Sequence, residues 1–197
     1  DKDGNFLYEY GKEKRTKISY DQVPKVLEQA FIATEDSHFY EHHGIDIKRT
    51  AKAILVNLTG DFGSQGGSTI TQQVIKNSFL TPEKTLKRKV QEWDLAYQLE
   101  QKYSKHDILM MYLNKIYLGN RSYGVAAAAK NYYGIEANDL KKLSLAQAAM
   151  LAGLPQSPNN YDPTKPENKQ AATNRRNVVL SSMLRDGYIT EKQMQEA

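Results

Sequence analysis

EDSHFYEHHG, residues 35–44, is the stretch around which the chain is organised, with three carboxylates and three imidazoles in ten residues. In the apolar helical run before it, Leu27, Phe31 and Glu35 recur every four residues, which predicts one shared buried helix face. Burial and the negative end of the helix dipole should both raise the pKa of the Glu35 carboxyl, which makes it a candidate proton acceptor. The alternative is a structural glutamate that His38 or a backbone donor satisfies.

The composition is that of one globular domain, or of one domain with a minor lobe: 197 residues, 40% hydrophobic and 25% charged. The net charge of +4 suits an anionic partner such as a phosphate-bearing lipid, a membrane surface or nucleic acid. The absence of cysteine excludes disulfides, thiolate zinc sites and a cysteine nucleophile. No apolar run reaches the ~18–20 residues of a membrane-spanning helix, and we expect an excised domain whose anchor lies outside this sequence.

The order of turn and cap residues predicts a mainly α domain. Residues 6–10 and 16–20 are extended patterns around the turn-prone Gly11, which predicts a small N-terminal β element. After these segments the start and stop signals are those of helices, because cap residues precede runs with a 3.6-residue apolar period and glycine or proline follows them. Helices are predicted over residues 123–133 and 167–185, and after Pro24, Asp46, Thr69, Thr81, Ser104, Ser144 and Thr190.

GGSTITQQ, residues 66–73, is a second polar cluster, in which Thr69 and Gln72 form a capping box at a helix start. Glycine lets the backbone approach a ligand, and the N–H groups of a helix start favour an anion. The remaining hydroxyl and amide groups suit sugars or phosphate oxygens, and Lys76 lies one turn further on. The alternative, an ordinary helix cap after a loop, is equally open because local chemistry alone explains it.

RKVQE, residues 88–92, places Arg88 four residues and Lys89 three residues before Glu92, so both cations can flank one carboxylate. Taken alone, this motif favours a solvated ion pair worth a few tenths of a kcal/mol. The cations would hold Glu92 ionised, in contrast with Glu35. Two carboxyl groups in opposed environments suit glycosyl chemistry.

Two further groups of residues carry less chemistry. The three histidines within residues 35–44 lack the spacing of a zinc site, so we predict no zinc there. KHDILMMYLN, residues 105–114, consists mostly of core side chains, of which Tyr112 and Asn114 are the candidates to face a cleft.

Five motifs, in this order, resemble those of the peptidoglycan glycosyltransferases of family 51: EDSHFYEHHG, GGSTITQQVIKN, RKVQE, KHDILMMYLNKIYLG and RRNVVL. The resemblance runs from about Val23 to Leu184, and its first two motifs are highly specific together. RRNVVL, residues 175–180, resembles the bifunctional members, the class A penicillin-binding proteins, more than the monofunctional enzymes. A transpeptidase domain would then follow Ala197.

The resemblance implies a lysozyme-like fold in a single domain over residues 1–197, with a head lobe and a membrane-dipping jaw over residues 45–67. It implies polymerisation of lipid II into β-1,4-linked glycan with inversion and release of undecaprenyl pyrophosphate. The implied catalytic residues are Glu35, the general base on the acceptor 4-hydroxyl, and Glu92, a second carboxylate that would lie with cations at the donor pyrophosphate. No cofactor is required, although Mg²⁺ or Mn²⁺ at the pyrophosphate is compatible with this set. The implied substrate-binding residues are Asp36, His42, Lys52, Ser68, Thr69, Gln72, Gln73, Lys76, Lys84, Arg88, Lys89 and Asn114.

The same resemblance implies partners and a location. The partners are lipid II, the growing lipid-linked glycan and a membrane surface contacted through the jaw, with moenomycin as an inhibitor and no nucleic acid. The location is the extracytoplasmic face of the cell membrane, with an N-terminal transmembrane anchor outside this sequence. Lys52 and Lys84 stand where some relatives carry arginine, so they keep the charge and lose the bidentate fork.

Two rival functions stay open on the sequence alone. A lysozyme-like hydrolase or lytic transglycosylase would use Glu35 as a general acid, but a neutral glycan does not require Lys76, Arg88 and Lys89. A non-catalytic basic module that binds nucleic acid or anionic lipid would tolerate Glu35→Gln. A leaving pyrophosphate needs fixed positive charge, which favours the polymerase.

Overall fold

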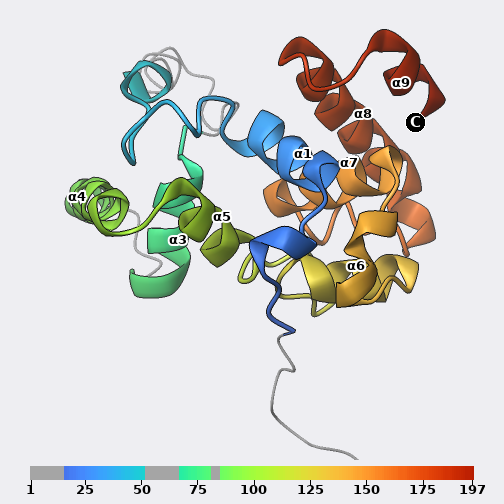
Figure 1. The fold of residues 1–197 in the computed structure, drawn as a ribbon, viewed down its shortest axis with the longest axis horizontal. Coiled ribbons are helices and arrows are strands. Elements are labelled where there is room, and N and C mark those ends of the chain that lie inside the picture. The colour runs from blue at the N-terminus through green and yellow to red at the C-terminus, as the bar shows by residue number, and fades with distance from the viewer. Residues whose placement is uncertain (1–15, 52–66, 81–84) are drawn as a thin grey trace, which may run out of the picture.

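The fold is almost wholly helical, as predicted. A computed structural model describes residues 16–51, 67–80 and 85–197, and Figure 1 shows how their helices are arranged. Within these described residues, the β structure is limited to one isolated bridge between Tyr117 and Tyr123. Short 3-10 turns join several of the helices. The main helices are α1 (Lys25–Glu35), α3 (Ile70–Phe79), α4 (Leu86–Lys102), α5 (Lys105–Leu113), α6 (Val125–Tyr133), α7 (Leu145–Gly153), α8 (Lys169–Arg185) and α9 (Glu191–Glu196).

The helix starts follow local cap chemistry. Thr69, Ser104, Ser144 and Thr190 each accept a hydrogen bond from the backbone N–H three residues further on, and each belongs to a complete capping box. A cap of this kind contributes about 1 kcal/mol. The predicted starts of these four helices are confirmed. Gly134 ends α6 in the left-handed region at φ 68°, where glycine carries no steric penalty.

Helix α1 occupies the centre of the described structure, with α3 and α4 on one side and α7 and α8 on the other (Figure 1). It packs on α7 and α8, while α3 packs on α4 and α5. Leu27 and Phe31 of α1 are fully buried, which stabilises the fold by about 1.5–3 kcal/mol for each side chain. In α7, Ala148 and Ala149 are fully buried, and such small side chains let neighbouring helices approach closely.

The predicted N-terminal β element is not found where the structure describes it. Residues 16–19 are irregular, Tyr20–Gln22 forms a 3-10 helix, and residues 6–10 lie outside the described ranges. Asn114 explains why the predicted strand over the second segment is wrong. Its Oδ1 accepts from the Ile18 N–H at 2.9 Å, and its Nδ2 donates to the Ile18 carbonyl at 3.0 Å. One side-chain amide thus satisfies both backbone groups, which a neighbouring strand would otherwise satisfy.

Most of the predicted jaw, residues 45–67, lies outside the described residues. Its first part, residues 47–51, is helical, and Asp46 Oδ1 accepts from the Arg49 N–H at 2.9 Å, as a predicted cap would. In the part of the chain that the structure describes, no helix is both long enough and apolar enough to cross a membrane.

Candidate active site

A cleft of about 780 Å³ opens between the C-terminal end of α1, the start of α3 and one face of α8. The segment that follows α7, with Pro155 and Gln156, also forms part of the cleft wall. Four predicted site residues line the cleft: Glu35, Ser68, Gln73 and Lys76. Its wall also carries three arginines: Arg49, Arg175 and Arg185.

Glu35 is the last residue of α1 and is partly exposed to the cleft. Its Oε2 accepts a hydrogen bond from Gln73 Nε2 at 2.9 Å. Burial raises the pKa of the Glu35 carboxyl, while this hydrogen bond and the charges of Arg175 and Arg49 oppose the rise. The pKa is raised on balance, as the helix pattern predicted. The alternative of a structural glutamate satisfied by His38 is not what the structure shows, because His38 bonds with Asp46 and Gln73 donates to Glu35.

Three arginines hold their guanidinium groups near Glu35 by donating to backbone carbonyls. Arg49 Nη1 donates to the Glu35 carbonyl at 2.6 Å, and Arg185 Nη2 donates to a carbonyl in the last turn of α1 at 3.4 Å. Arg175 Nε donates to the final carbonyl of α7 at 3.1 Å. The last carbonyls of a helix lack intrahelical partners and attract cations. Sequence reasoning missed Arg49 and Arg185 and gave Arg175 no role beyond its motif. The last carbonyls of α1, which lack partners within the helix, were a signal for Arg49 and Arg185.

Asp36 and His42 lie beneath the cleft and brace it. Asp36 is fully buried, and its Oδ2 accepts from the Ile70 N–H and from His42 Nε2, both at 2.9 Å. The Gly44 N–H donates to His42 Nδ1 at 3.2 Å, so Nε2 is the ring nitrogen that donates to Asp36. The pair therefore ties the end of α1 to the start of α3. Neither residue lines the cleft, so their contact with substrate stays a prediction.

Thr69 and Gln72 are also buried, within the capping box of α3. Thr69 Oγ1 donates to the Gly44 carbonyl at 2.7 Å. Gly44 has a φ of 89°, and a Cβ there would lie 2.7 Å from a backbone carbonyl oxygen of α4, so glycine is required. These contacts fix the first turn of α3 and thereby the direction of the next side chain, Gln73, into the cleft.

Glu92 is buried on α4 between two cations, as its motif predicted. Its Oε1 bonds with Lys89 Nζ, and its Oε2 lies 3.3 Å from Arg88 Nη2. Lys89 Nζ also donates to Ser68 Oγ at 3.1 Å, which connects this cluster to the cleft. Because Glu92 is only 1% exposed, the solvated ion pair favoured from the sequence is wrong. The cations form the basic end of the site, with Lys76 on the nearby cleft wall.

The surroundings of Glu92 do not fit a divalent cation. Two cationic side chains already occupy its carboxylate, whereas Mg²⁺ or Mn²⁺ requires several oxygen ligands. Among the described residues, no group of three or more histidine, aspartate or glutamate side chains is placed to hold a metal ion. Cationic donors beside a polar cleft suit an anion instead.

Asn114, like Asp36 and His42, does not line the cleft, and both of its amide atoms bond to Ile18. Its contact with substrate stays a prediction. Lys52 and Lys84 lie outside the described residues, so their roles stay predictions.

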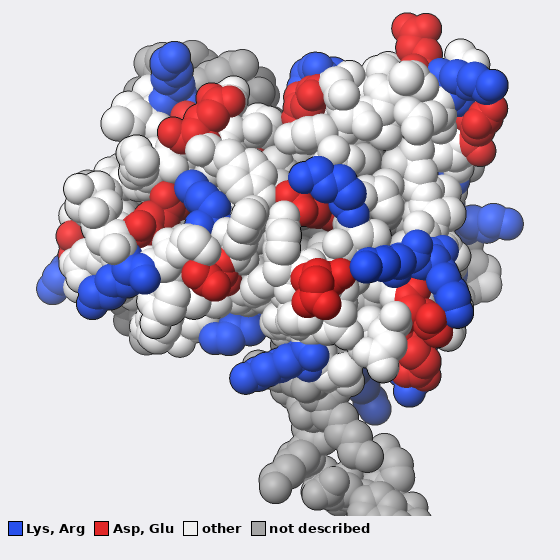
Figure 2. Space-filling model, in the orientation of Figure 1, with Lys and Arg blue, Asp and Glu red and all other residues white. Residues whose placement is uncertain are grey.

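The surface charge is mixed on the face that Figure 2 shows. Figure 2 shows lysine and arginine side chains interspersed with aspartate and glutamate over the viewed face. The net charge of +4 is therefore not gathered into one basic patch on that face. A nucleic-acid-binding module would instead present a continuous basic surface to the phosphate backbone. The groups suited to an anion lie in the cleft itself.

A helical domain that holds one carboxyl group of raised pKa in a cleft, with a cation-bound carboxylate beside that cleft, has the features of a glycosyl-transferring enzyme. The model of the transglycosylase family matches residues 3–184, and the chain belongs to that family. The family predicted from the five motifs is thus confirmed.

Similar proteins extend well beyond the length of this chain. It is 54% identical over 197 residues to "Penicillin-binding protein 1A/1B" of Bacillus subtilis (strain 168), covering 100% of this chain and 21% of that protein. It is 48% identical over 194 residues to "Penicillin-binding protein 1A" of Escherichia coli (strain K12), covering 98% of this chain and 22% of that protein. A crystal structure of penicillin-binding protein 1A from Haemophilus influenzae matches with a TM-score of 0.57 at 29% identity, covering 98% of this chain and 19% of that one. The chain spans about a fifth of these relatives.

Proposed function

We propose that this domain polymerises lipid II into β-1,4-linked glycan with inversion and releases undecaprenyl pyrophosphate. The observation that carries the proposal is one cleft whose wall combines Glu35, whose pKa is raised by burial, with Lys76 and with Ser68, to which Lys89 donates a hydrogen bond. Membership of the transglycosylase family supports it.

Glu35 acts as the general base in this proposal. Its carboxylate accepts the proton of the acceptor 4-hydroxyl while the hydroxyl oxygen attacks the anomeric carbon of the donor. The bond from that carbon to the pyrophosphate oxygen breaks in the same displacement, which inverts the carbon and leaves the pyrophosphate as an anion. A base must be ionised to act, and Gln73, Arg175 and Arg49 all lower the pKa of Glu35 against the effect of burial.

The basic end of the cleft stabilises the leaving group. Negative charge develops on the departing pyrophosphate, and Lys76, Lys89 and Arg88 supply fixed positive charge for it. Glu92 is a positioning residue, because its carboxylate orients the Lys89 ammonium that also reaches Ser68 Oγ. No second acid is required, since pyrophosphate leaves readily without protonation.

We expect the domain to act at the extracytoplasmic face of the cell membrane, because its family resemblance implies that location and a lipid-linked substrate requires contact with a membrane. We expect an N-terminal transmembrane anchor and a C-terminal transpeptidase domain in the longer protein, because the relatives are about five times as long as this chain. Residues 45–67 would contact the membrane surface, and moenomycin would inhibit by competing for the cleft.

A lysozyme-like hydrolase is the second candidate, because a raised pKa also suits a general acid. The two functions predict opposite pH dependences for Glu35. A base works only when ionised, so the polymerase rate rises as pH increases through the pKa of Glu35. An acid works only when protonated, so the hydrolase rate falls over the same range.

The deciding experiment is incubation with labelled lipid II, followed by separation of the glycan products by length. Glu35→Gln should lower polymer formation by about 100-fold or more, the usual contribution of a general base. Glu41→Gln is the matched control, since it removes an exposed carboxylate from the same stretch. No polymer from the folded wild-type protein would refute the proposed function. Polymer formation that survives Glu35→Gln would keep the activity and refute the assignment of the base.

A further inference from the structure

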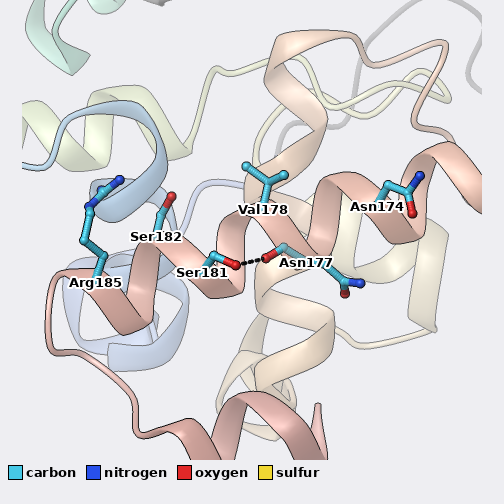
Figure 3. Close-up of a pocket in the computed structure, with 6 residues that line it drawn as sticks. All are labelled: Asn174, Asn177, Val178, Ser181, Ser182 and Arg185. Atoms are coloured by element: carbon cyan, nitrogen blue, oxygen red, sulfur yellow. Dashed lines mark hydrogen bonds between the residues drawn. The ribbon is translucent and has the colours of Figure 1, made fainter.

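The outer face of α8 carries a row of side chains that the proposed mechanism does not use. A shallow groove of about 520 Å³ runs along it, and its lining residues recur at short intervals on one side of the helix. Positions 174 to 185 span about 17 Å at the helical rise of 1.5 Å per residue. We call this surface the α8 ledge, and Figure 3 shows its six residues: Asn174, Asn177, Val178, Ser181, Ser182 and Arg185.

The α8 ledge is continuous with the candidate active site. Val178, Ser182 and Arg185 line both the groove and the cleft that contains Glu35. The basic end of the site is formed by α3 and α4, which lie on the other side of α1 from α8 (Figure 1). A substrate with its pyrophosphate at that end and its reacting sugar at Glu35 therefore directs its further sugars toward α8.

The residues that line the ledge include one cation, and the guanidinium of Arg176 flanks the ledge where it bonds with Asn177. Its cation, Arg185, is paired with Asp186, with Nε 2.7 Å from Oδ1 and Nη2 3.2 Å from Oδ2. The other lining residues are amides, hydroxyls and one valine. An uncharged ligand rich in hydroxyl groups meets matching donors and acceptors here.

The amides of the ledge are oriented by their neighbours. Asn174 Oδ1 accepts from Gln170 Nε2 at 2.9 Å, and Asn177 Oδ1 accepts from Arg176 Nε at 3.1 Å and Nη2 at 2.9 Å. With their oxygens engaged, the two asparagines present their Nδ2 groups as donors. Val178 is 51% exposed and offers an apolar surface on which a pyranose ring can lie.

We propose that the α8 ledge binds the uncharged sugar units of the glycan strand that extend beyond the reacting bond. This inference rests on the proposed function and names the part of the substrate that the mechanism leaves unplaced. Hydrogen bonds to hydroxyl and acetamido groups hold the strand between successive additions. The ledge therefore governs how many sugars are added before release, and leaves the bond-forming step to Glu35.

The test uses Asn174→Ala/Asn177→Ala, a double variant that leaves every cleft-lining residue in place. Alanine suits an exposed helix, so the fold should be kept. Gln98→Ala/Gln101→Ala is the matched control, because it removes two exposed amides from α4. The probe is chitotetraose, a β-1,4-linked N-acetylglucosamine tetramer that has the linkage and acetamido groups and lacks lipid, peptide and pyrophosphate.

Two measurements separate the ledge from the proposed activity. In a titration followed by amide NMR shifts, chitotetraose should perturb α8, and the double variant should bind it ~10- to 30-fold more weakly, as expected for two lost hydrogen bonds. With labelled lipid II, the double variant should release strands earlier and make glycan about threefold shorter or more, while the first coupling stays within about twofold of wild type. The control should match wild type in both assays.

The outcomes distinguish the two proposals. Two results would refute the proposed role of the ledge and leave the proposed polymerase activity intact. One is glycan of normal length from the double variant. The other is chitotetraose binding that does not perturb α8 or that is equally strong in the double variant. Binding on α8 that the double variant loses, in a wild-type protein that makes no polymer from lipid II, would support the ledge as a glycan site and refute the proposed function.

Discussion

Replacing Gln73 by methionine should move the acid limb of the pH–rate profile toward higher pH. Gln73 Nε2 donates to Glu35 Oε2 at 2.9 Å, and this hydrogen bond lowers the pKa of the carboxyl. Methionine has a similar volume and no N–H donor, so Glu35 loses a bond that favours its ionised form. The pKa of Glu35, already raised by burial, should rise further.

The expected size of the effect follows from the strength of that bond. A hydrogen bond to a charged group contributes about 1.5–3 kcal/mol. Glu35 is partly exposed to the cleft, so water replaces part of the lost bond, and the lower end of the range applies. About 1.4 kcal/mol corresponds to a tenfold change in an equilibrium, so the rate at a pH on the acid limb should fall about tenfold. At higher pH, where Glu35 is ionised in both proteins, the rates should converge.

The assay measures kcat/KM with labelled lipid II across the acid limb for wild type, Gln73→Met and Gln156→Met. Gln156 lines the same cleft and accepts a hydrogen bond from the Tyr161 hydroxyl, so it is the matched control. The Tyr112 hydroxyl lies 3.5 Å from Gln73 Oε1, and losing that weak contact should lower the unfolding temperature by only about 2–4 °C.

An acid limb that stays in place, in a folded Gln73→Met protein, would refute the idea that this hydrogen bond sustains the ionised base. A displaced alkaline limb would instead identify Glu35 as the acid of a hydrolase, because the protonated form would then be the active one.

Three other substitutions test the electrostatics and the packing. The pKa of Glu35 is raised in the folded protein, so protonation of Glu35 favours folding. This contribution to stability is fully present below the unfolded pKa and is lost as pH rises through the folded pKa. Glu35→Gln should therefore raise the unfolding temperature by about 2–4 °C at neutral pH and leave it unchanged in acid. Lys89→Met should cost about 1–3 kcal/mol by urea unfolding and reduce polymer formation, because the buried carboxylate keeps only Arg88. Asn114→Ala should cost about 1–2 kcal/mol and leave kcat/KM unchanged, because its amide serves Ile18.

Each of these substitutions has an outcome that would contradict the reasoning, and Lys89→Met also has a matched control. Lys87→Met removes an exposed cation from the same helix and should be neutral, so equal losses for the two lysines would argue against a special role for Lys89. If the Asn114→Ala protein had normal stability and weaker substrate binding, the result would support the predicted contact between Asn114 and substrate. A Glu35→Gln protein less stable than wild type at neutral pH would show that the buried carboxylate is fully compensated.

Local chemistry made much of the fold predictable. The capping boxes at Thr69, Ser104, Ser144 and Thr190 need only residues three apart, and all four helices begin there. The prediction for Glu35 rested only on the helical period of Leu27, Phe31 and Glu35, and it correctly indicated a carboxyl group of raised pKa. The cations before Glu92 likewise lie on one helix, so their approach to it followed from spacing.

Contacts between distant segments were not predictable from the chain. Gln73 lies 38 residues from Glu35, and Asn114 lies 96 residues from Ile18, so neither pair leaves a local pattern. The burial of Glu92 also depends on neighbouring helices, which is why spacing alone favoured a solvated ion pair.

The two glutamates differ in how their charges are balanced, and this difference suits each to one task. On Glu35, Arg175 and Arg49 act on the pKa through their charge while Gln73 provides the hydrogen bond, so protonation disturbs one contact to a neutral amide. On Glu92, Lys89 bonds directly and Arg88 lies 3.3 Å away, so this carboxylate holds two cationic side chains in place. Burial raises the pKa of Glu35, which lines the cleft where the hydroxyl of a substrate would lie. The carboxyl group in the cleft wall therefore suits proton transfer, and the one beside two cations suits their orientation.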